Sequence, residues 1–352
     1  MDKINAKIKV VPEDFIVEEI GEKWGCRAEV LKSSDKREFK LNLDNKNDFV
    51  VCEMEKIDID HFSAISIIAG YLKKTSHDIG YAGTKDKRAW TSQRISVYQP
   101  DIELLKSFNH PNIVLKNFKF SKRKIKIGYL DGNRFRLVLR DIDCKEARKV
   151  VNKIKNFERF PNFFGSQRFG SVRKDNVQIG KLLLKKNFRE AFLLIFDNPE
   201  NLESDSEDWV KLLRRVNRKK MLMFVNSVQS KIYNEILEKV IEEDLDLGKE
   251  KIMLAGYGLN FSEGRLGEIE KEVLNKNGIS LKDFDIREFS FLRMRGSYRP
   301  AFTEIDMKEI SASDDDMFEG SKKIFLDFYL KSGAYATSFL ENFFVVTDFT
   351  NI

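Results

Sequence analysis

The residues best suited to chemistry in this chain lie between Gly80 and Gln93, in the stretch GYAGTKDKRAWTSQ. One acidic residue, Asp86, stands there among three cations, Lys85, Lys87 and Arg88. Nearby cations favour the ionised form of a carboxylate, whereas burial against a bound ligand opposes ionisation and raises the reactivity. The stretch is therefore a candidate for catalysis, and a solvated charged turn is the alternative.

The segments on either side of Asp86 are expected to be ordered. Between Asp60 and Lys74 the apolar residues recur at helical spacing, and Asp60 is a suitable N-cap. From Ser92 to Tyr98 the residues alternate, which predicts a strand. Asp86 thus falls on a connection between a helix and a strand, and such connections commonly carry chemistry.

A second candidate region surrounds Asp131-Gly132-Asn133, a strong turn signal. Two alternating runs flank this tripeptide between Lys124 and Arg140, which predicts two strands joined by a turn. The second run puts apolar residues on one face, namely Phe135, Leu137 and Leu139, and arginines on the other, namely Arg134, Arg136 and Arg140.

The order of elements predicts an α+β fold in more than one domain. A chain of 352 residues is longer than most single domains. Beyond Pro161 the apolar spacing becomes mostly helical, and strand-like alternation returns at Ile324 to Leu330. A helical middle between strand-rich ends fits α+β better than a regular alternation of strands and helices.

Charge in this sequence is dense but nearly balanced. Charged residues make up 34% of the chain while the net charge is only +6, so a basic surface must be local. Two clusters are dense enough to neutralise several phosphates, Lys122 to Lys126 and Arg214 to Lys220. Solvated faces are the alternative for each cluster, but RNA is a ligand that would suit both.

Composition argues against several other classes of protein. Three cysteines and three histidines, none at ligand spacing, make a disulfide framework, a zinc site or an iron site improbable. The N-terminus has no apolar signal region, and no run of about eighteen apolar residues occurs. We expect a cytoplasmic protein that does not enter a membrane and shows no sign of an obligate protein partner.

Several motifs together resemble one known family, the TruD family of tRNA pseudouridine synthases, over nearly the whole chain. Each motif alone is weak, whereas the ordered set is specific. In order they are Lys9-x-x-Pro12-Glu13-Asp14-Phe15-x-Val17-x-Glu19, Gly83-x-Lys85-Asp86-x-x-Ala89-x-Thr91-x-Gln93, Gly128-x-Leu130-x-Gly132-Asn133-x-Phe135, Pro161-Asn162-Phe163-Phe164-Gly165-x-Gln167-Arg168-Phe169-Gly170, Gln229-Ser230 and Gly333-Ala334-Tyr335-Ala336-Thr337.

The resemblance implies an architecture as well as an activity. It implies a pseudouridine synthase catalytic domain with a mixed, largely antiparallel sheet, formed by residues 1–159 and 304–352. This domain is interrupted by an inserted, mainly helical α/β TRUD domain at residues 160–303. The implied reaction isomerises uridine in tRNA, by family analogy at position thirteen of the D arm, and needs no cofactor and no metal.

The resemblance also implies the site residues. Asp86 corresponds to the nucleophile and Lys9 to the lysine that pairs with it. Phe135 corresponds to the aromatic residue that stacks on the target uracil, and the remaining pocket residues are Phe15, Asn133 and Tyr335. These types suit a flipped-out uridine, which must be stacked and read at its edge.

Two features depart from the family pattern. A lysine-rich stretch occupies Glu19 to Asn47, where a segment rich in glycine and glutamate is often found, and this puts the RNA contacts there in doubt. Tyr335 stands where some members have phenylalanine, which keeps a stacking surface and adds a hydroxyl. A tRNA-binding or tRNA-folding module without turnover is the alternative function, and a metal-dependent nuclease ranks last because no clustered ligands are evident.

Overall fold

The structure is a computed structural model that describes residues 3–29, 41, 47–169, 175–197, 208–245, 247 and 251–348. Gly170, the last residue of the motif that begins at Pro161, lies outside these residues, as does most of the lysine-rich stretch from Glu19 to Asn47. The chain divides into two compact units, the first made of Met1–Phe160 with Glu304–Ile352 and the second of Pro161–Thr303. Phe160 is fully buried in the core of the first unit.

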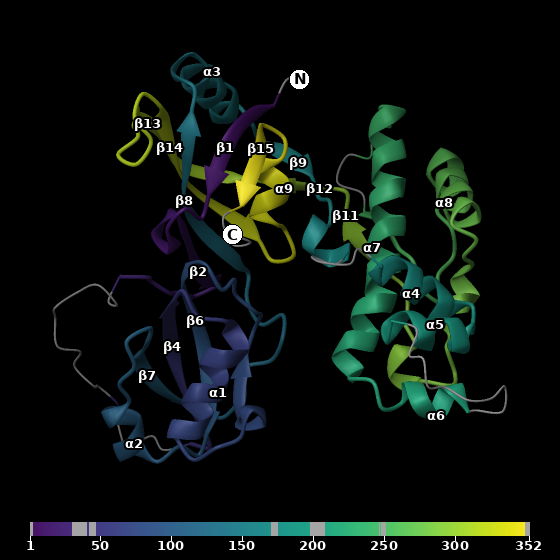
Figure 1. Ribbon diagram of the computed structural model, residues 1–352, viewed down its shortest axis with the longest axis horizontal. Coiled ribbons are helices and arrows are strands. Elements are labelled where there is room, and N and C mark those ends of the chain that lie inside the picture. Colours follow the sequence, from purple (N-terminus) through teal and green to yellow (C-terminus); the bar gives the residue numbers. More distant parts are fainter. Residues whose placement is uncertain are drawn as a thin grey trace. The chain divides into compact units, whose positions relative to one another are not determined.

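The first unit is built on an 11-stranded sheet whose central path runs β13-β14-β8-β2-β6-β4-β7 (Figure 1). Neighbouring strands on this path are antiparallel except β2 and β6, which are parallel, and β1 is parallel to β15. The mixed, largely antiparallel sheet predicted for an α+β fold is therefore confirmed. The strands are β1 (Ile4–Ile8), β2 (Phe15–Gly21), β3 (Trp24–Gly25), β4 (Phe49–Ile57), β5 (Ile79–Tyr81), β6 (Trp90–Tyr98), β7 (Ile113–Ser121), β8 (Gly132–Ile142), β13 (Asp306–Asp314), β14 (Lys322–Lys331) and β15 (Phe344–Asp348).

Two hydrophobic clusters cover the two halves of this sheet. One joins β1, β2, β8 and β14 with the helices α3 (Cys144–Lys155) and α9 (Ala336–Leu340). The other joins β4, β5, β6 and β7 with α1 (His61–Tyr71) and α2 (Ile102–Ser107). The parallel strands β2 and β6 lie where these halves meet.

Helix starts follow the sequence signals. The Asp60 carboxylate accepts a hydrogen bond from the Ser63 amide at 2.9 Å, as expected of the N-cap of α1. Asp143 caps α3 in the same way, through the amides of Lys145 and Glu146. The helix predicted between Asp60 and Lys74 is thus confirmed as α1, with an end that differs by a few residues.

The predicted pair of strands around Asp131-Gly132-Asn133 is wrong. Residues 122–131 form a loop, and β7 and β8 are not neighbours, because this loop carries the chain from the edge of the sheet to its centre. Gly132 is instead the first residue of β8. A Cβ atom at Gly132 would lie 2.1 Å from the Leu330 carbonyl oxygen, so the close approach of β14 explains the glycine.

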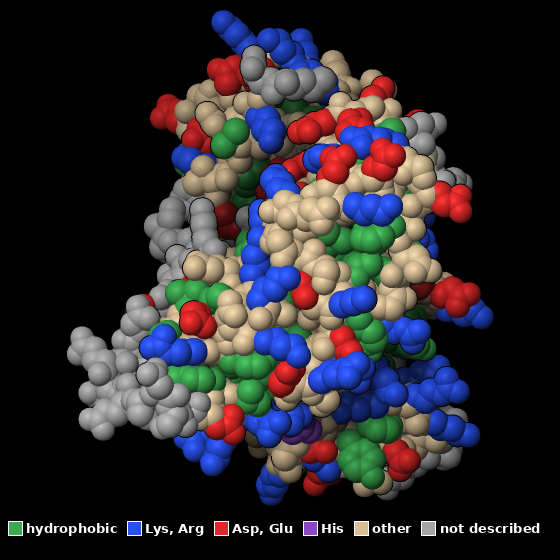
Figure 2. Space-filling view, turned by 90° about the vertical axis from the view of Figure 1, so that its right-hand side faces the viewer, with side chains coloured by type: hydrophobic (Ala, Val, Ile, Leu, Met, Phe, Trp, Pro, Cys, Tyr) green, Lys and Arg blue, Asp and Glu red, His purple; other side chains and the backbone are tan. Residues whose placement is uncertain are grey.

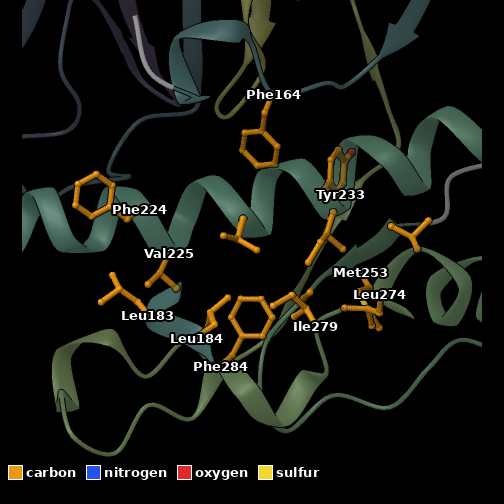
Figure 3. Packing of buried hydrophobic residues seen from close by; sticks show 14 of the residues in the cluster. Phe164, Leu183, Leu184, Phe224, Val225, Tyr233, Met253, Leu274, Ile279 and Phe284 are labelled. Carbon is orange, nitrogen blue, oxygen red and sulfur yellow. The ribbon is translucent and has the colours of Figure 1, made fainter. Parts of the chain in front are cut away.

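The second unit is mainly helical. Its helix α7 (Arg218–Glu242) is surrounded by the shorter elements, whose side chains converge with its own on one core (Figure 3). In that view Phe224, Val225 and Tyr233 come from α7, and Leu183 and Leu184 come from α4. The shorter elements are α4 (Asn176–Leu184), α5 (Phe188–Ile195), α6 (Trp209–Leu213), α8 (Gly264–Lys276) and the strand pair β10 (Lys251–Leu254) with β11 (Ser297–Pro300).

A second strand pair forms where the chain passes between the units, β9 (Arg159–Pro161) with β12 (Phe302–Glu304). On the face drawn in Figure 2, Lys and Arg side chains are mixed with Asp and Glu and with scattered hydrophobic side chains. This face is therefore not uniformly basic, in keeping with the nearly balanced composition.

Candidate active site

The parallel pairing of β2 with β6 brings the two most important predicted residues together. Ile16 of β2 pairs with Trp90 of β6, so both strands begin at the same edge of the sheet. Lys9 lies on the turn before β2, and Asp86 lies on the loop before β6. Because parallel neighbours start side by side, 77 residues of sequence separate two side chains that touch.

Lys9 and Asp86 form an ion pair in which the ammonium group is buried and the carboxylate is partly exposed to solvent. Lys9 Nζ lies 2.9 Å from Asp86 Oδ2, and the two side chains are 1% and 41% exposed. A buried ammonium is costly unless it is paired, so it holds a carboxylate firmly. Asp86 therefore keeps an accessible face while its position is fixed from behind.

A second carboxylate completes the surroundings of Lys9. Asp348 Oδ2 lies 3.3 Å from Lys9 Nζ, because Asp348 of β15 pairs with Ile8 of β1, next to Lys9. The Phe15 ring centroid lies 4.5 Å from the same nitrogen, a cation–π contact. One buried cation thus faces two carboxylates and one aromatic ring.

Two of the three cations near Asp86 in sequence bind groups other than its carboxylate. Lys85 Nζ donates to Glu19 Oε1 at 2.8 Å, with both side chains largely buried. The Arg88 guanidinium donates to the carbonyls of Lys9 and Val10 at 2.7 and 2.5 Å. Lys87 is exposed. Lys85 and Arg88 thus direct their charged ends to other groups, and their hydrogen bonds position the loop that carries Asp86.

Arg88 also supports a strained backbone. Lys9 has a φ of 54°, in the left-handed region that costs a non-glycine residue about 1–2 kcal/mol. The two hydrogen bonds from Arg88 hold the carbonyls on this turn. The strained backbone therefore lies at Lys9 itself, the residue whose side chain enters the site.

A further lysine lies under the loop. Lys56 is fully buried at the end of β4, and its Nζ donates to the carbonyls of Asp86 at 2.5 Å and Ile59 at 2.9 Å. Burial lowers the pKa of Lys56 to about 8, an effect that the negative charges of Asp86 and Asp60 oppose. The main chain of Asp86 is thus fixed by one lysine and its side chain by another.

The predicted pocket residues on β2 and β8 share one face of the sheet. Val17 pairs with Phe135 and Glu19 with Asn133, and paired side chains lie on the same side. The Phe15 and Phe135 rings meet edge to face at 6.4 Å, and Phe135 stacks on Phe328 at 5.4 Å. The Lys85–Glu19 ion pair places the Asp86 loop over this same face.

Asn133 has an atom suited to reading a ligand. Its Oδ1 is buried and has no hydrogen-bond partner in the described part of the chain. A buried unpaired acceptor is costly, so a ligand donor would be favoured there. Phe135 is only 7% exposed, so little of its ring surface is open in this structure.

Tyr335 comes from a different segment of the first unit. It caps the N-terminus of α9 on the turn after β14 and is 38% exposed. That turn is held by a hydrogen bond from the Ser332 amide to the Asp131 carbonyl at 2.7 Å. Since Leu330 of β14 pairs with Asn133, Tyr335 lies five residues after a direct neighbour of the pocket.

Sequence reasoning missed Asp348 and Lys56. Neither stands in a motif, and both reach the site through strand pairing, β15 with β1 and β4 with β6. Arg88 was noted only as a cation near Asp86, and its role as a donor to a distant turn carries no local signal.

The cysteine thiols and the possible metal ligands among the described residues do not indicate a different chemistry. Burial raises the pKa of the Cys26 and Cys52 thiols. Within the described ranges, no group of three or more His, Cys, Asp or Glu residues could hold a metal ion. No helix among the described residues is long and apolar enough to cross a membrane.

Comparison with known proteins gives the same family along the chain. The sequence matches the family tRNA pseudouridine synthase D (TruD) over residues 1–206 and 250–343. A protein of Methanocaldococcus jannaschii named probable tRNA pseudouridine synthase D 1 is 30% identical, over 97% of this chain and 96% of its own length. A Methanococcus maripaludis protein named probable tRNA pseudouridine synthase D is 29% identical over 96% of this chain and 94% of its own length.

The fold agrees with the sequence. The crystal structure of a TruD protein from Methanosarcina mazei is similar with a TM-score of 0.71 and 26% identity, over 97% of this chain and 94% of that one. The family match covers both units and includes the stretches that carry Lys9, Asp86, Asn133 and Phe135. This chain therefore belongs to the TruD family of tRNA pseudouridine synthases.

Proposed function

We propose that this protein isomerises uridine to pseudouridine in tRNA, with Asp86 as the nucleophile and the uridine at position thirteen of the D arm as the target. The observation that carries the proposal is the Lys9–Asp86 ion pair, in which a half-exposed carboxylate is held by a fully buried ammonium. Such a carboxylate is fixed in place and open to a ligand on one side.

The reaction moves one bond within the substrate. The bond from uracil N1 to ribose C1′ breaks, the base turns, and a bond from C5 to C1′ forms; the proton lost from C5 is balanced by one gained at N1. An ionised carboxylate supplies the electron pair for a covalent intermediate from which the base can turn. The reaction needs no oxidant and no group donor, consistent with the expectation of no cofactor.

The surrounding residues have roles that fit this chemistry. A uridine within folded RNA must leave its stack before its glycosidic bond can react. Phe135 stacks on the uracil, Phe15 adds an apolar wall beside it, and Asn133 Oδ1 can accept from the uracil N3–H. The hydroxyl of Tyr335 can bond to a ribose or phosphate. Lys9 holds the carboxylate in position through their ion pair.

We assign the two parts of the chain accordingly. Residues 1–159 and 304–352 form the catalytic domain, and residues 160–303 form the inserted TRUD domain. All six proposed site residues lie in the first unit. We place the reaction in the cytoplasm, where tRNA is the partner.

The target can be tested with two transcripts. Purified protein is incubated, without metal or cofactor, with an unmodified tRNA transcript and with the same transcript carrying cytidine at position thirteen. Pseudouridine is mapped by carbodiimide-blocked primer extension. We expect one stop, at position thirteen, in the first transcript only. A stop elsewhere refutes the assigned position, and no stop in any tRNA of a whole pool supports the binding module instead.

A further inference from the structure

Strand β7 lies at one end of the sheet path (Figure 1). Residues of β7 and of the loop after it line a cleft that is rich in cations. Its volume is about 730 Å³. Its charged lining residues are Arg94, Lys119, Lys122, Arg123, Lys124 and Lys126. No Asp or Glu is among the described residues that line it, so an anion entering the cleft meets positive charge only.

Four of these cations are not compensated by carboxylates. Lys119, Lys122, Arg123 and Lys126 are exposed, and none forms an ion pair with a carboxylate in the described part of the chain. Elsewhere the pattern differs: Arg265 alone pairs with three glutamates. Like charges gathered without counter-charges repel each other, so a bound polyanion would stabilise the cleft.

The loop that carries most of these cations is firmly held. The Ile125 amide donates to the buried Ser96 Oγ at 3.0 Å, and Lys124 Nζ donates to the His77 carbonyl. A Cβ at Gly80 would lie 2.3 Å from the Ile125 carbonyl oxygen, so the loop packs directly on β5. The positive charges are therefore presented by an ordered surface rather than by a free loop.

The same loop is connected to the active site at two points. The Gly128 amide donates to the Ala82 carbonyl at 2.8 Å, four residues before Asp86. The Asp131 amide donates to the Ile20 carbonyl at 3.0 Å, and the chain then enters β8 toward Asn133. The loop that carries the cleft cations is thus hydrogen-bonded to the two segments that lead to Asp86 and Asn133.

Aromatic and apolar surface lies beside the cations. Tyr129 lines the cleft and is 67% exposed, and Ile127 on the same loop is 72% exposed. Exposed aromatic side chains next to lysines are the usual means of binding single-stranded nucleic acid, because bases stack on the ring while phosphates meet the cations.

We propose that this cleft binds the phosphodiester backbone of the tRNA strand next to the target uridine. Lys122, Arg123 and Lys126 contact phosphates, and Tyr129 stacks on an unpaired base. The inference rests on the proposed function, since it takes tRNA as the ligand. It adds a second binding site on the catalytic unit, distinct from the residues that hold the uracil.

A triple variant tests the proposal, K122Q with R123Q and K126Q. Its control is K145Q with R148Q and K153Q, which removes the same charge from exposed positions on α3. Affinity for unmodified tRNA is measured by filter binding between 50 and 500 mM salt, and far-UV circular dichroism checks the fold. Each lost phosphate contact should reduce the steepness of the plot of log K against log salt by roughly 0.7. Three lost contacts should therefore make the slope shallower by about 2 and weaken binding about 10²-fold at 50 mM.

The outcomes separate the cleft from the activity. If the triple variant and the control bind with the wild-type slope, the cleft proposal fails, whether or not the wild type makes pseudouridine. If only the triple variant loses affinity and slope, the cleft proposal holds, even where the wild type makes no pseudouridine and the proposed function fails. Excess inorganic phosphate should not reproduce the loss, and if it displaces tRNA at matched ionic strength, the cleft is a site for small anions.

Tyr129 is tested separately. Y129A should weaken tRNA binding roughly tenfold and leave the salt slope unchanged, because stacking releases no counterions. Y129F should bind like the wild type. Equal affinity of Y129A and the wild type would remove the stacking role.

Discussion

Replacing Lys56 by methionine should change how the stability of the first unit depends on pH. Burial lowers the pKa of this lysine from its ordinary value of 10.5 to about 8. Between these pH values the unfolded chain holds a proton that the folded protein has released. The free energy of unfolding therefore rises with pH in this window, and the stability gained is lost as the pH falls through 8.

The size of the effect follows from the two values. The difference between 10.5 and about 8 corresponds to roughly 3 kcal/mol. The unfolding free energy of the wild type, relative to that of K56M, should thus increase by roughly 3 kcal/mol between pH 7.5 and pH 10.5, since methionine does not titrate. The same replacement leaves the carbonyls of Asp86 and Ile59 without their donor, so we expect kcat to fall by about 10²-fold through misplacement of the loop.

The assay can be confined to the relevant unit. Trp24 and Trp90 lie in the first unit and Trp209 in the second, so a W209F background makes tryptophan fluorescence report the first unit alone. Urea unfolding is followed at several pH values for this background and for K56M and K145M made in it. K145M alters an exposed lysine and should show no such trend. A flat or falling difference for K56M across the window would refute the reasoning.

Two further predictions concern ion pairs in the first unit. R140M should lower the free energy of unfolding by about 3–5 kcal/mol in urea titrations, because Arg140 is buried and pairs with the buried carboxylates of Asp14 and Asp315; a loss below 1 kcal/mol would contradict this account. K9M should keep tRNA affinity while kcat falls in single-turnover assays, because Asp86 loses the cation that positions it; an unchanged kcat would remove the role of Lys9.

Local patterns in the sequence predicted much of the fold. An N-cap such as Asp60 acts over two or three residues, so the start of α1 could be predicted from the sequence. The alternation of Phe135, Leu137 and Leu139 likewise gave the buried face of β8. These features depend on residues close in sequence.

The errors come from pairing over long distances. The turn signal at Asp131-Gly132-Asn133 predicted adjacent strands, but β8 pairs with β2 and β14, and Gly132 serves the close approach of β14. Local composition cannot specify which strands become neighbours. Likewise Lys85 and Arg88, close to Asp86 in the chain, contact other groups, and the partner of Asp86, Lys9, comes from a turn 77 residues away in sequence.

The site shows the same division. Family resemblance identified Lys9 and Asp86, and the structure places their charged ends 2.9 Å apart. Lys56 and Asp348 belong to no motif, and each reaches the site only because β4 and β15 lie beside β6 and β1. Residues that support a site through tertiary contacts leave little trace in one sequence.

The central claim is that the Asp86 carboxylate forms the bond that lets the base turn. The most direct measurement compares wild type and D86N in single-turnover conversion of a tRNA transcript, with tRNA affinity and thermal melting measured on the same samples. We predict that D86N melts and binds tRNA like the wild type but forms no detectable pseudouridine, because an amide has the shape but not the nucleophilicity of the carboxylate. Conversion by D86N at the wild-type rate would contradict the account.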